Sequence, residues 1–262
     1  MNRLDTTLER LRQQQRSGLV CYFTAGDPDY ATCLELLGGM AAAGADIIEL
    51  GMPFSDPVAD GPSIQAAHLR ALAGGQTAAR TIELVRALRQ RDAHTPLVLM
   101  GYFNPVMQYG EARFLQDAHE AGVDALILVD LPLEHDAPFR AAATAVGIHL
   151  IRMTAPTSDD ARLDKLLAAA SGFVYHVALN GTTGAASSEA NTIVAAIERV
   201  RRHTTLPVAA GFGIRTAAQV AELAGKVDLI VVGSRLVDVL QQDGVAAALT
   251  EIRSLAAALQ AN

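Results

Sequence analysis

The chain is poor in lysine and cysteine, and each shortage argues against a kind of chemistry. Lysine occurs only at Lys165, inside a predicted helix, and at Lys226, before a predicted strand. A Schiff-base aldolase needs a lysine amine in its site, so neither position favours that mechanism. The two cysteines, Cys21 and Cys33, make neither a disulfide framework nor a metal site. They are typical of small buried side chains in a reducing cytosol.

Long apolar runs and an excess of basic residues are also missing. No apolar run approaches the ~20 residues that a membrane-spanning helix needs. Lys plus Arg is 21 against 28 for Asp plus Glu, a net charge of -7, which does not favour a nucleic-acid or membrane surface. The seven histidines show no metal-ligand spacing. At the N-terminus, Leu4, Leu8 and Leu11 have helical spacing, which predicts an amphipathic helix rather than a signal peptide.

Short apolar runs alternate with longer helical stretches along the whole chain. The predicted strands are Leu19–Thr24, Asp46–Leu50, Leu97–Tyr102, Ala125–Val129, His149–Met153, Phe173–Val177, Pro207–Ala210 and Leu229–Val232. They show little polar alternation, which is typical of parallel strands covered on both faces. Eight such units predict an α/β fold, a (β/α)8 TIM barrel with an added N-terminal helix, as one domain over residues 1–262. A doubly wound open sheet is the alternative, but no Gly-x-Gly-x-x-Gly follows the first strand.

Two carboxylates mark the end of the second predicted strand. Glu49 lies one residue from the strand end, and Asp60 ends the stiff, proline-punctuated loop that follows. Burial of a carboxylate is costly unless it is paired or used, so acid–base chemistry is the functional interpretation. Desolvation at the barrel mouth is expected to raise the pKa of Glu49. The structural alternatives are a strand-end carboxylate that binds a neighbouring amide at Glu49, and a turn or helix N-cap at Asp60.

Two glycine-rich turns follow the seventh and eighth predicted strands, at residues 211–216 and 233–235. The loops after these strands recur as phosphate sites in such barrels, because glycine lets an anion approach the backbone amides at a helix N-terminus. The turn at 181–184 could add donors, and Arg215 and Arg235 either add charge or are solvated. The sequence therefore predicts acid–base chemistry without a cofactor on a phosphorylated substrate.

Residues 49–62, Glu-Leu-Gly-Met-Pro-Phe-Ser-Asp-Pro-Val-Ala-Asp-Gly-Pro, resemble the signature of the tryptophan synthase alpha subunit, the indole-3-glycerol phosphate lyase family. The likeness continues in order through residues 24–28, 102–105, 130–132, 155–157, 211–214 and 233–234, over essentially the whole chain. It implies a barrel enzyme, a carbon–carbon lyase that cleaves indole-3-glycerol phosphate to indole and glyceraldehyde 3-phosphate in tryptophan biosynthesis.

The resemblance also implies roles for individual residues. Glu49 is the expected acid/base, Asp60 the expected partner of the indole N–H, and Tyr175 a further catalytic-site residue. The expected substrate-binding residues are Tyr22, Thr183, Gly184, Phe212, Gly213, Gly233 and Ser234. The apolar residues Met100, Val129 and Met153 are expected to pack around the indole together with Tyr22 and Phe212.

The resemblance further implies a partner and a compartment. The family works in the cytoplasm with a beta subunit, in an alpha2beta2 heterotetramer. Pyridoxal phosphate belongs to that beta subunit, so no cofactor is expected in this chain. The loop from Pro53 to Pro57 and the region of Asn104 and Pro105 resemble the docking surface of the family.

Several positions depart from the family pattern. The loop after the sixth strand, Ala178 to Ser188, differs from the usual sequence, and Tyr22, Gly101, Arg152 and His176 are also unusual. A lyase that works without a beta subunit and a non-catalytic regulatory paralogue are therefore alternatives. A phosphosugar isomerase is a further class, but its usual acid at the end of the seventh strand is missing.

Overall fold

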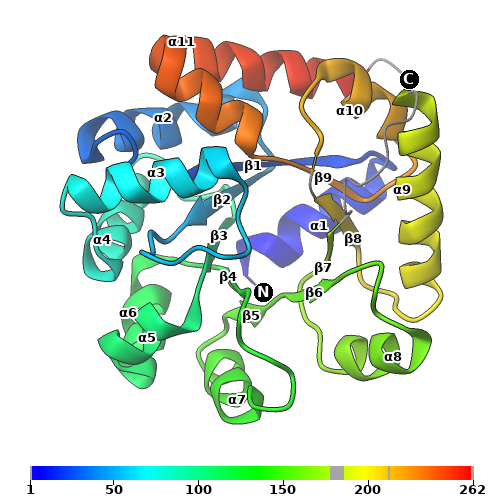
Figure 1. The fold of residues 1–262 in the computed structure, drawn as a ribbon, viewed down its shortest axis with the longest axis horizontal. Helices are drawn as coiled ribbons and strands as arrows, with labels where there is room; N and C mark the ends of the chain where they lie inside the picture. The colour runs from blue at the N-terminus through cyan, green and yellow to red at the C-terminus, as the bar shows by residue number, and fades with distance from the viewer. Residues whose placement is uncertain (1, 178–185, 212, 261–262) are drawn as a thin grey trace.

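The computed structural model describes residues 2–177, 186–211 and 213–260, and strands and helices alternate along these ranges (Figure 1). The strands are β1 (Gly18–Thr24), β2 (Ile47–Gly51), β3 (Leu97–Gly101), β4 (Ala125–Leu128), β5 (His149–Leu150), β6 (Arg152–Thr154), β7 (Val174–Val177), β8 (Val208–Gly211) and β9 (Leu229–Val232). The helices are α1 (Arg3–Gln13), α2 (Tyr30–Ala43), α3 (Pro62–Ala73), α4 (Ala78–Arg89), α5 (Phe103–Tyr109), α6 (Glu111–Ala121), α7 (Ala137–Ala145), α8 (Asp160–Ala168), α9 (Ala186–Arg201), α10 (Ala217–Leu223) and α11 (Ser234–Ala258).

The strands form one parallel sheet in the order β5-β4-β3-β2-β1-β9-β8-β7-β6, with the larger helices outside it (Figure 1). Its two end strands, β5 and β6, are consecutive in the chain and separated only by Ile151, whose N–H donates to the Leu126 carbonyl at 2.9 Å. They correspond to the single predicted strand His149–Met153. Its first part, β5, pairs with β4, and its second part, β6, pairs with β7. The predicted TIM barrel is confirmed, with its fifth strand divided in two.

The strands are buried because both of their faces are covered. All seven residues of β1 and all five of β2 and of β3 are buried. Their Val, Ile and Leu side chains fill the barrel on one face and pack against the helices on the other, as the near-continuous apolar runs predict. Helix α9 begins at Ala186, and residues 186–190 contain no proline or glycine that would interrupt it.

The N-terminal helix α1 lies behind the barrel in Figure 1 and covers the end at which the strands begin. Its first turn is fixed by a capping box, in which Asn2 and Asp5 bond each other's backbone N–H groups. Leu4, Leu8 and Leu11 are buried, so the predicted amphipathic helix is confirmed.

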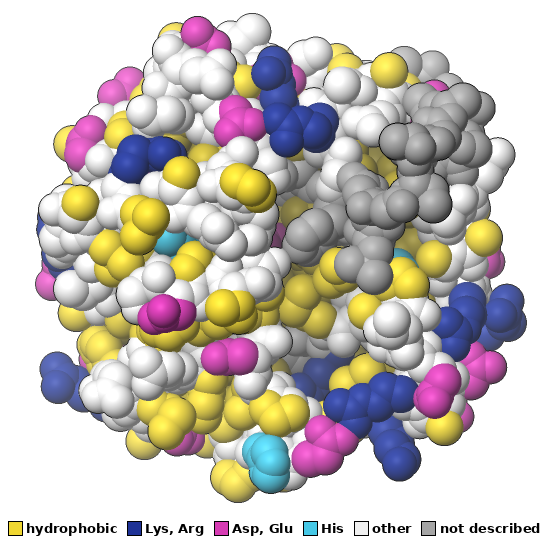
Figure 2. Space-filling view, in the orientation of Figure 1, with side chains coloured by type: hydrophobic (Ala, Val, Ile, Leu, Met, Phe, Trp, Pro, Cys, Tyr) yellow, Lys and Arg dark blue, Asp and Glu magenta, His cyan; other side chains and the backbone are white. Residues whose placement is uncertain are grey.

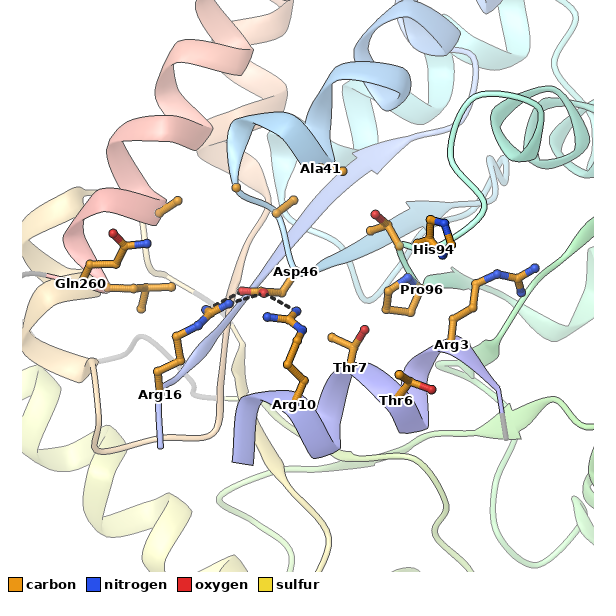
Figure 3. A pocket seen from close by; sticks show the side chains of 15 residues that line it. Arg3, Thr6, Thr7, Arg10, Arg16, Ala41, Asp46, His94, Pro96 and Gln260 are labelled. Carbon is orange, nitrogen blue, oxygen red and sulfur yellow. Dashed lines mark hydrogen bonds and ion pairs between the residues drawn. The ribbon is translucent and has the colours of Figure 1, made fainter. Parts of the chain in front are cut away.

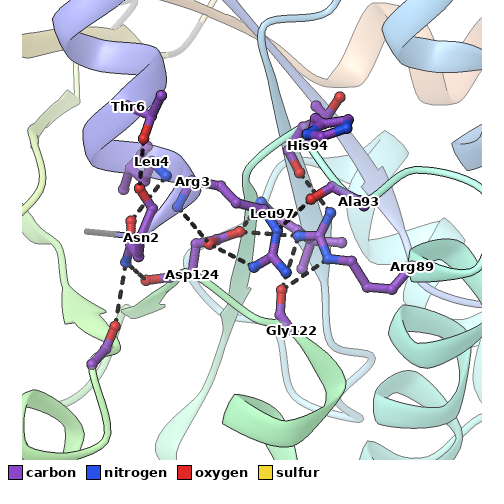
Figure 4. Close-up of polar contacts among 12 residues, drawn as sticks. Asn2, Arg3, Leu4, Thr6, Arg89, Ala93, His94, Leu97, Gly122 and Asp124 are labelled. Carbon is purple, nitrogen blue, oxygen red and sulfur yellow. Dashed lines mark hydrogen bonds and ion pairs between the residues drawn. The ribbon is translucent and has the colours of Figure 1, made fainter.

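Buried carboxylates bind arginines at this end of the barrel. Asp46, which directly precedes β2, accepts bonds from Arg16 at 2.6 Å and Arg10 at 3.0 Å, beside a hollow of about 560 Å³ (Figure 3). Asp124, which directly precedes β4, accepts bonds from Arg3 at 3.1 Å and Arg89 at 3.0 Å (Figure 4). These ion pairs tie α1 to the beginnings of the strands.

Two further findings concern the described ranges. None of the helices there combines the length and the apolar character needed to cross a membrane. Cys21 and Cys33 are both buried free thiols.

Candidate active site

A cavity of about 120 Å³ opens at the carboxyl ends of the strands, where barrels of this class place their chemistry. Among the predicted site residues, its lining contains Tyr22, Glu49, Asp60, Tyr175, Gly213, Gly233 and Ser234. The other predicted site residues, Thr183, Gly184 and Phe212, lie outside the described residues. The larger hollow beside Asp46 is at the opposite end, and its arginines are already bound to carboxylates.

Glu49 projects from β2 into the cavity and is 1% exposed. In the described part of the chain, neither of its carboxylate oxygens has a hydrogen-bond partner. Burial raises the pKa of Glu49 to about 8, and the nearby charge of Asp60 adds to the rise. The sequence predicted this direction. A carboxyl group in this state is protonated at neutral pH and can also ionise close to it.

Asp60 is held by a tyrosine from the next strand along the sheet. The Tyr102 hydroxyl, just after β3, donates to Asp60 Oδ2 at 2.8 Å and accepts the Ala59 N–H at 2.9 Å. Burial raises the pKa of Asp60, although the bond from Tyr102 opposes the rise. The N-cap position of α3 is Gly61, without a side-chain cap. Asp60 therefore points to the cavity and does not cap the helix.

The two cavity tyrosines fit because glycines end the neighbouring strands. A Cβ atom on Gly51 would lie 2.1 Å from the Tyr22 hydroxyl, and a Cβ atom on Gly211 would lie 2.2 Å from the Tyr175 ring. Both distances are far below van der Waals contact. Tyr22 is paired with Glu49 in the β1–β2 register, so these side chains share the inner face of the barrel. Burial raises the pKa values of Tyr22 and Tyr175 well above the usual range.

The end of the cavity predicted to hold phosphate is made of Gly213, Gly233 and Ser234. Gly213 has a φ of 78°, a conformation that glycine adopts without strain. Helix α11 begins at Ser234 and its N-cap, Gly233, makes no side-chain cap bond. The first N–H groups of such a helix lack intrahelical partners and favour an anion.

The arginines near this end are engaged elsewhere. Arg215 lines the cavity and binds Asp238 at 2.7 Å, while Arg235 binds Glu251 at 3.0 Å. Neither arginine is a free counter-charge for a phosphate.

Of the three apolar residues expected to pack around the indole, Met100 lines the cavity. Met153 and Val129 are partly buried against the core but do not belong to the lining. In the β6–β7 register Met153 is the partner of Tyr175, so it shares the inner face.

Two unusual residues of the sequence lie on the outer face of the same strands. Arg152 is buried and bonded to Asp136 of the β4–α7 segment. The His176 Nδ1 atom lies 3.0 Å from the Thr154 hydroxyl. Both residues alternate with inward-facing Met153 and Tyr175 along the strands, and neither lines the cavity. The other region of departure, residues 178–185, lies outside the described residues.

Sequence reasoning missed two residues behind the cavity. Tyr102 was noted only as part of a motif, and His68 only as one histidine among several. The structure brings Tyr102 to Asp60 and brings His68 to Tyr22, at 3.3 Å between the His68 Nε2 and Tyr22 hydroxyl atoms. The one available signal for His68 was its place on the buried face of the helix after the Asp60 loop, with Ala67 and Ala71.

The chain is similar to tryptophan synthase proteins over its whole length. A family model described as the tryptophan synthase alpha chain matches residues 8–262. The tryptophan synthase alpha chain of Legionella pneumophila subsp. pneumophila is 35% identical with a TM-score of 0.90, covering 99% of this chain and 98% of that one. A chain of Mycobacterium tuberculosis tryptophan synthase is 34% identical with a TM-score of 0.91, covering 100% of this chain and 99% of that one.

These matches identify the family and its reaction. Alpha subunits cleave indole-3-glycerol phosphate in tryptophan biosynthesis without a cofactor of their own, and they pair with a beta subunit that holds pyridoxal phosphate. By its full-length match and its barrel, this chain belongs to the tryptophan synthase alpha chain family.

Proposed function

We propose that Glu49 and Asp60 carry the cleavage of indole-3-glycerol phosphate in the cavity at the carboxyl ends of the strands. The observation that carries this proposal is Glu49 itself, a buried carboxyl group that has no hydrogen-bond partner among the described residues and whose pKa is raised to about 8. A buried, unpaired acid is costly for folding, so its retention at a cavity indicates use in proton transfer.

The reaction requires one proton to be delivered and one to be removed. Protonated Glu49 gives its proton to C3 of the indole, which makes the ring a cationic indolenine. The ionised Glu49 then accepts the proton of the glyceryl hydroxyl next to the bond that breaks. As the carbon–carbon bond cleaves, its electron pair returns to the ring, and indole and the aldehyde form. Glu49 ends protonated, so the cycle needs no external acid or base.

Asp60 stabilises the charged intermediate in this proposal. Its carboxylate accepts a hydrogen bond from the indole N–H, which becomes more acidic when the ring is cationic. Tyr102 holds one oxygen, Oδ2, and thereby fixes the direction of the other. Tyr22, Tyr175 and Met100 line the walls around the ring.

The phosphate is bound mostly by backbone amides. Gly213, Gly233 and Ser234 all line the cavity, and Gly233 and Ser234 lie at the N-terminus of α11, where the helix dipole favours an anion. Thr183, Gly184 and Phe212 are proposed as further contacts on the family resemblance alone.

The beta subunit is proposed to dock on the face formed by the β2–α3 loop and α5. Val58 is 85% exposed in that loop and Met107 is 52% exposed on α5, although large hydrophobic side chains are usually covered. Figure 2 shows hydrophobic side chains gathered over the α3–α5 side of this face. Ser55, Asp56 and Asn104 are exposed on the same surface, whereas Pro105 is partly buried and Pro53 and Pro57 are buried.

The docking face is tested with Val58→Asp and Met107→Asp. Each is expected to reduce the stimulation of indole release by a beta subunit, because a charge replaces an exposed apolar contact. Arg202→Glu changes an exposed charge beyond α9 and is the control. Equal stimulation of all three variants contradicts this docking face.

The function is tested by measuring indole release from indole-3-glycerol phosphate by the purified chain, alone and with a beta subunit. Slow release that rises sharply with the beta subunit supports a coupled alpha subunit. Fast release that is indifferent to it supports the stand-alone lyase. If neither condition gives indole, the proposed chemistry is wrong and the non-catalytic paralogue takes its place.

The proposed compartment is the cytoplasm. The support is the pair of free thiols at Cys21 and Cys33, which suits a reducing environment, together with the biosynthetic role of the family.

A further inference from the structure

His68 lies directly behind the cavity wall and is 1% exposed. It projects from the second turn of α3. Its Nδ1 atom accepts the backbone N–H of Phe54 at 3.1 Å, and its Nε2 atom lies 3.3 Å from the Tyr22 hydroxyl. The His68 side chain therefore connects α3 with strand β1 and with the start of the β2–α3 loop.

These contacts determine which ring nitrogen carries the proton. The Phe54 N–H can only donate, so His68 Nδ1 must be unprotonated. A neutral His68 then carries its proton on Nε2 and donates it to the Tyr22 oxygen. The proton of Tyr22 is left to turn elsewhere, for example to the Thr24 hydroxyl at 3.3 Å. Burial lowers the pKa of His68, which favours this neutral form.

The loop that His68 contacts is the one that carries Asp60. Tyr102 binds its far end at Ala59 and Asp60, and Gln65 of α3 donates to the Asp60 carbonyl at 2.8 Å. The Phe54 contact is at the near end. A backbone N–H without its acceptor in this partly buried place costs about 1–3 kcal/mol, so loss of His68 favours a shift of the loop.

We propose that His68 is a positioning residue for the lyase reaction. Through Nδ1 it fixes the start of the Asp60 loop, and through Nε2–H it fixes the rotation of the Tyr22 hydroxyl in the cavity wall. It touches no substrate and acts only through these two neighbours. The inference rests on the roles proposed above for Asp60 and Tyr22.

Three substitutions separate the two contacts. His68→Leu removes both of them and is expected to lower kcat/KM for indole release about 10²-fold, as small misplacements in a site do. His68→Asn places an amide oxygen near the position of Nδ1. Because it keeps the Phe54 bond, its kcat/KM is expected to be about tenfold higher than that of His68→Leu. His68→Gln places an amide N–H near the position of Nε2 and retains only the Tyr22 bond. Each variant is assayed as the full chain with a beta subunit.

A matched control distinguishes positioning from the general cost of altering a buried histidine. His176 is also buried, at 3% exposure, and also bonded at Nδ1, but it lies on the outer face of β7. His176→Asn is expected to lower Tm without the kcat/KM pattern of the His68 variants. Equal kinetic losses in His176→Asn and His68→Asn overturn the proposal.

The coupling to Tyr22 is tested separately. If His68 acts through the Tyr22 hydroxyl, Tyr22→Phe and His68→Asn are non-additive, because each variant breaks the same bond. Additive losses overturn this half of the proposal. Nitrogen-15 NMR of the wild-type chain reports the tautomer directly and needs no variant to fold. A proton on Nε2 is expected, and a proton on Nδ1 overturns the proposal.

Failure of this inference differs from failure of the proposed function. Glu49→Gln and Asp60→Asn are assayed in parallel. If both are inactive while all three His68 variants keep wild-type kcat and KM, the positioning role is wrong and the lyase site stands. If both retain full activity, the proposed roles of the two carboxylates are wrong, whatever the His68 variants show.

Discussion

Two carboxylates of strand β2 and its start lie in opposite environments. Asp46 directly precedes the strand, is 8% exposed, and accepts bonds from Arg10, Arg16 and the Leu19 N–H. Glu49 lies three residues on, is 1% exposed, and has no partner among the described residues. Two carboxyl groups in similar burial thus differ in whether anything neutralises them.

Their pKa values follow from that difference. Burial pushes the pKa of Asp46 upward, but the bonds from Arg16 and Leu19 outweigh burial and the pKa is lowered. At Glu49 no contact from the described residues opposes the effect of burial, and the pKa rises to about 8. Asp124, at the same end as Asp46, likewise accepts hydrogen bonds from Arg3, Arg89 and the Leu97 N–H. The carboxylates at the start of the strands form ion pairs, whereas the proposed chemistry uses those at the carboxyl ends.

The largest expected effect comes from Glu49→Gln. The amide has nearly the same shape but cannot transfer a proton, so kcat for indole release is expected to fall about 10³-fold. The measurement is steady-state indole formation with a beta subunit, and circular dichroism verifies the fold. Glu35→Gln, on an exposed face of α2, is the control. Full activity of Glu49→Gln would show that Glu49 is not the proton donor.

The same substitution is expected to change how stability depends on pH. The folded pKa of Glu49 is raised from 4.5 to about 8, so its unfavourable ionisation costs nothing below pH 4.5 and grows as pH rises toward 8. Relative to wild type, the free energy of unfolding of Glu49→Gln is expected to rise by about 3 kcal/mol between pH 5 and pH 8. Denaturant unfolding at the two pH values measures the gain. A pH-independent difference contradicts the raised pKa.

Asp46→Asn is expected to change the free energy of unfolding in the opposite direction and by a somewhat smaller amount. It leaves Arg10 and Arg16 without their carboxylate, and because both arginines are partly exposed we expect a loss of about 2 kcal/mol. The lowered pKa means that the wild-type contribution is present above pH 3.8 and is lost as pH falls through the folded value. Denaturant unfolding of both proteins at pH 7 measures this loss of stability. At temperatures where the variant is folded, kcat is expected to stay within twofold of wild type.

The smallest effect concerns Tyr102→Phe. Without the hydroxyl, Asp60 loses one bond and the Ala59 N–H loses its acceptor, so kcat/KM is expected to fall about tenfold. Tyr109→Phe is the matched control, since it also removes a tyrosine bond to a carboxylate, at Asp117. If the two variants lose equally, Tyr102 does not orient Asp60.

The strands and the lead carboxylate were predictable because their signals are local. An apolar run such as Leu229–Val232 is itself the strand, and its bounds agree with the prediction. Glu49 was found because its place near a strand end puts it in the barrel mouth. The division of the fifth strand was not predictable, since it depends on which neighbours β5 and β6 pair with.

The residues that support the site were missed for a different reason. His68 and Phe54 are 14 positions apart, and Tyr102 and Asp60 are 42 apart. Neither pair follows a helical or strand period, because each contact forms only when several elements are packed. The ion pair between Arg152 and Asp136 could not be predicted for the same reason. Asp136 precedes α7, and the local sequence around Arg152 gives no sign of the contact.

The most direct test of the contrast between the two ends is a carbon-13 NMR titration of the glutamate side-chain carboxyls, with the Glu49 signal assigned by its loss in Glu49→Gln. We expect the Glu49 carboxyl to titrate with a midpoint near 8, because no described residue bonds to it and offsets its burial. A midpoint near the ordinary value of 4.5 would show that Glu49 is solvated or paired in solution. In that case it is not the proton donor at neutral pH, and the account of this site is wrong.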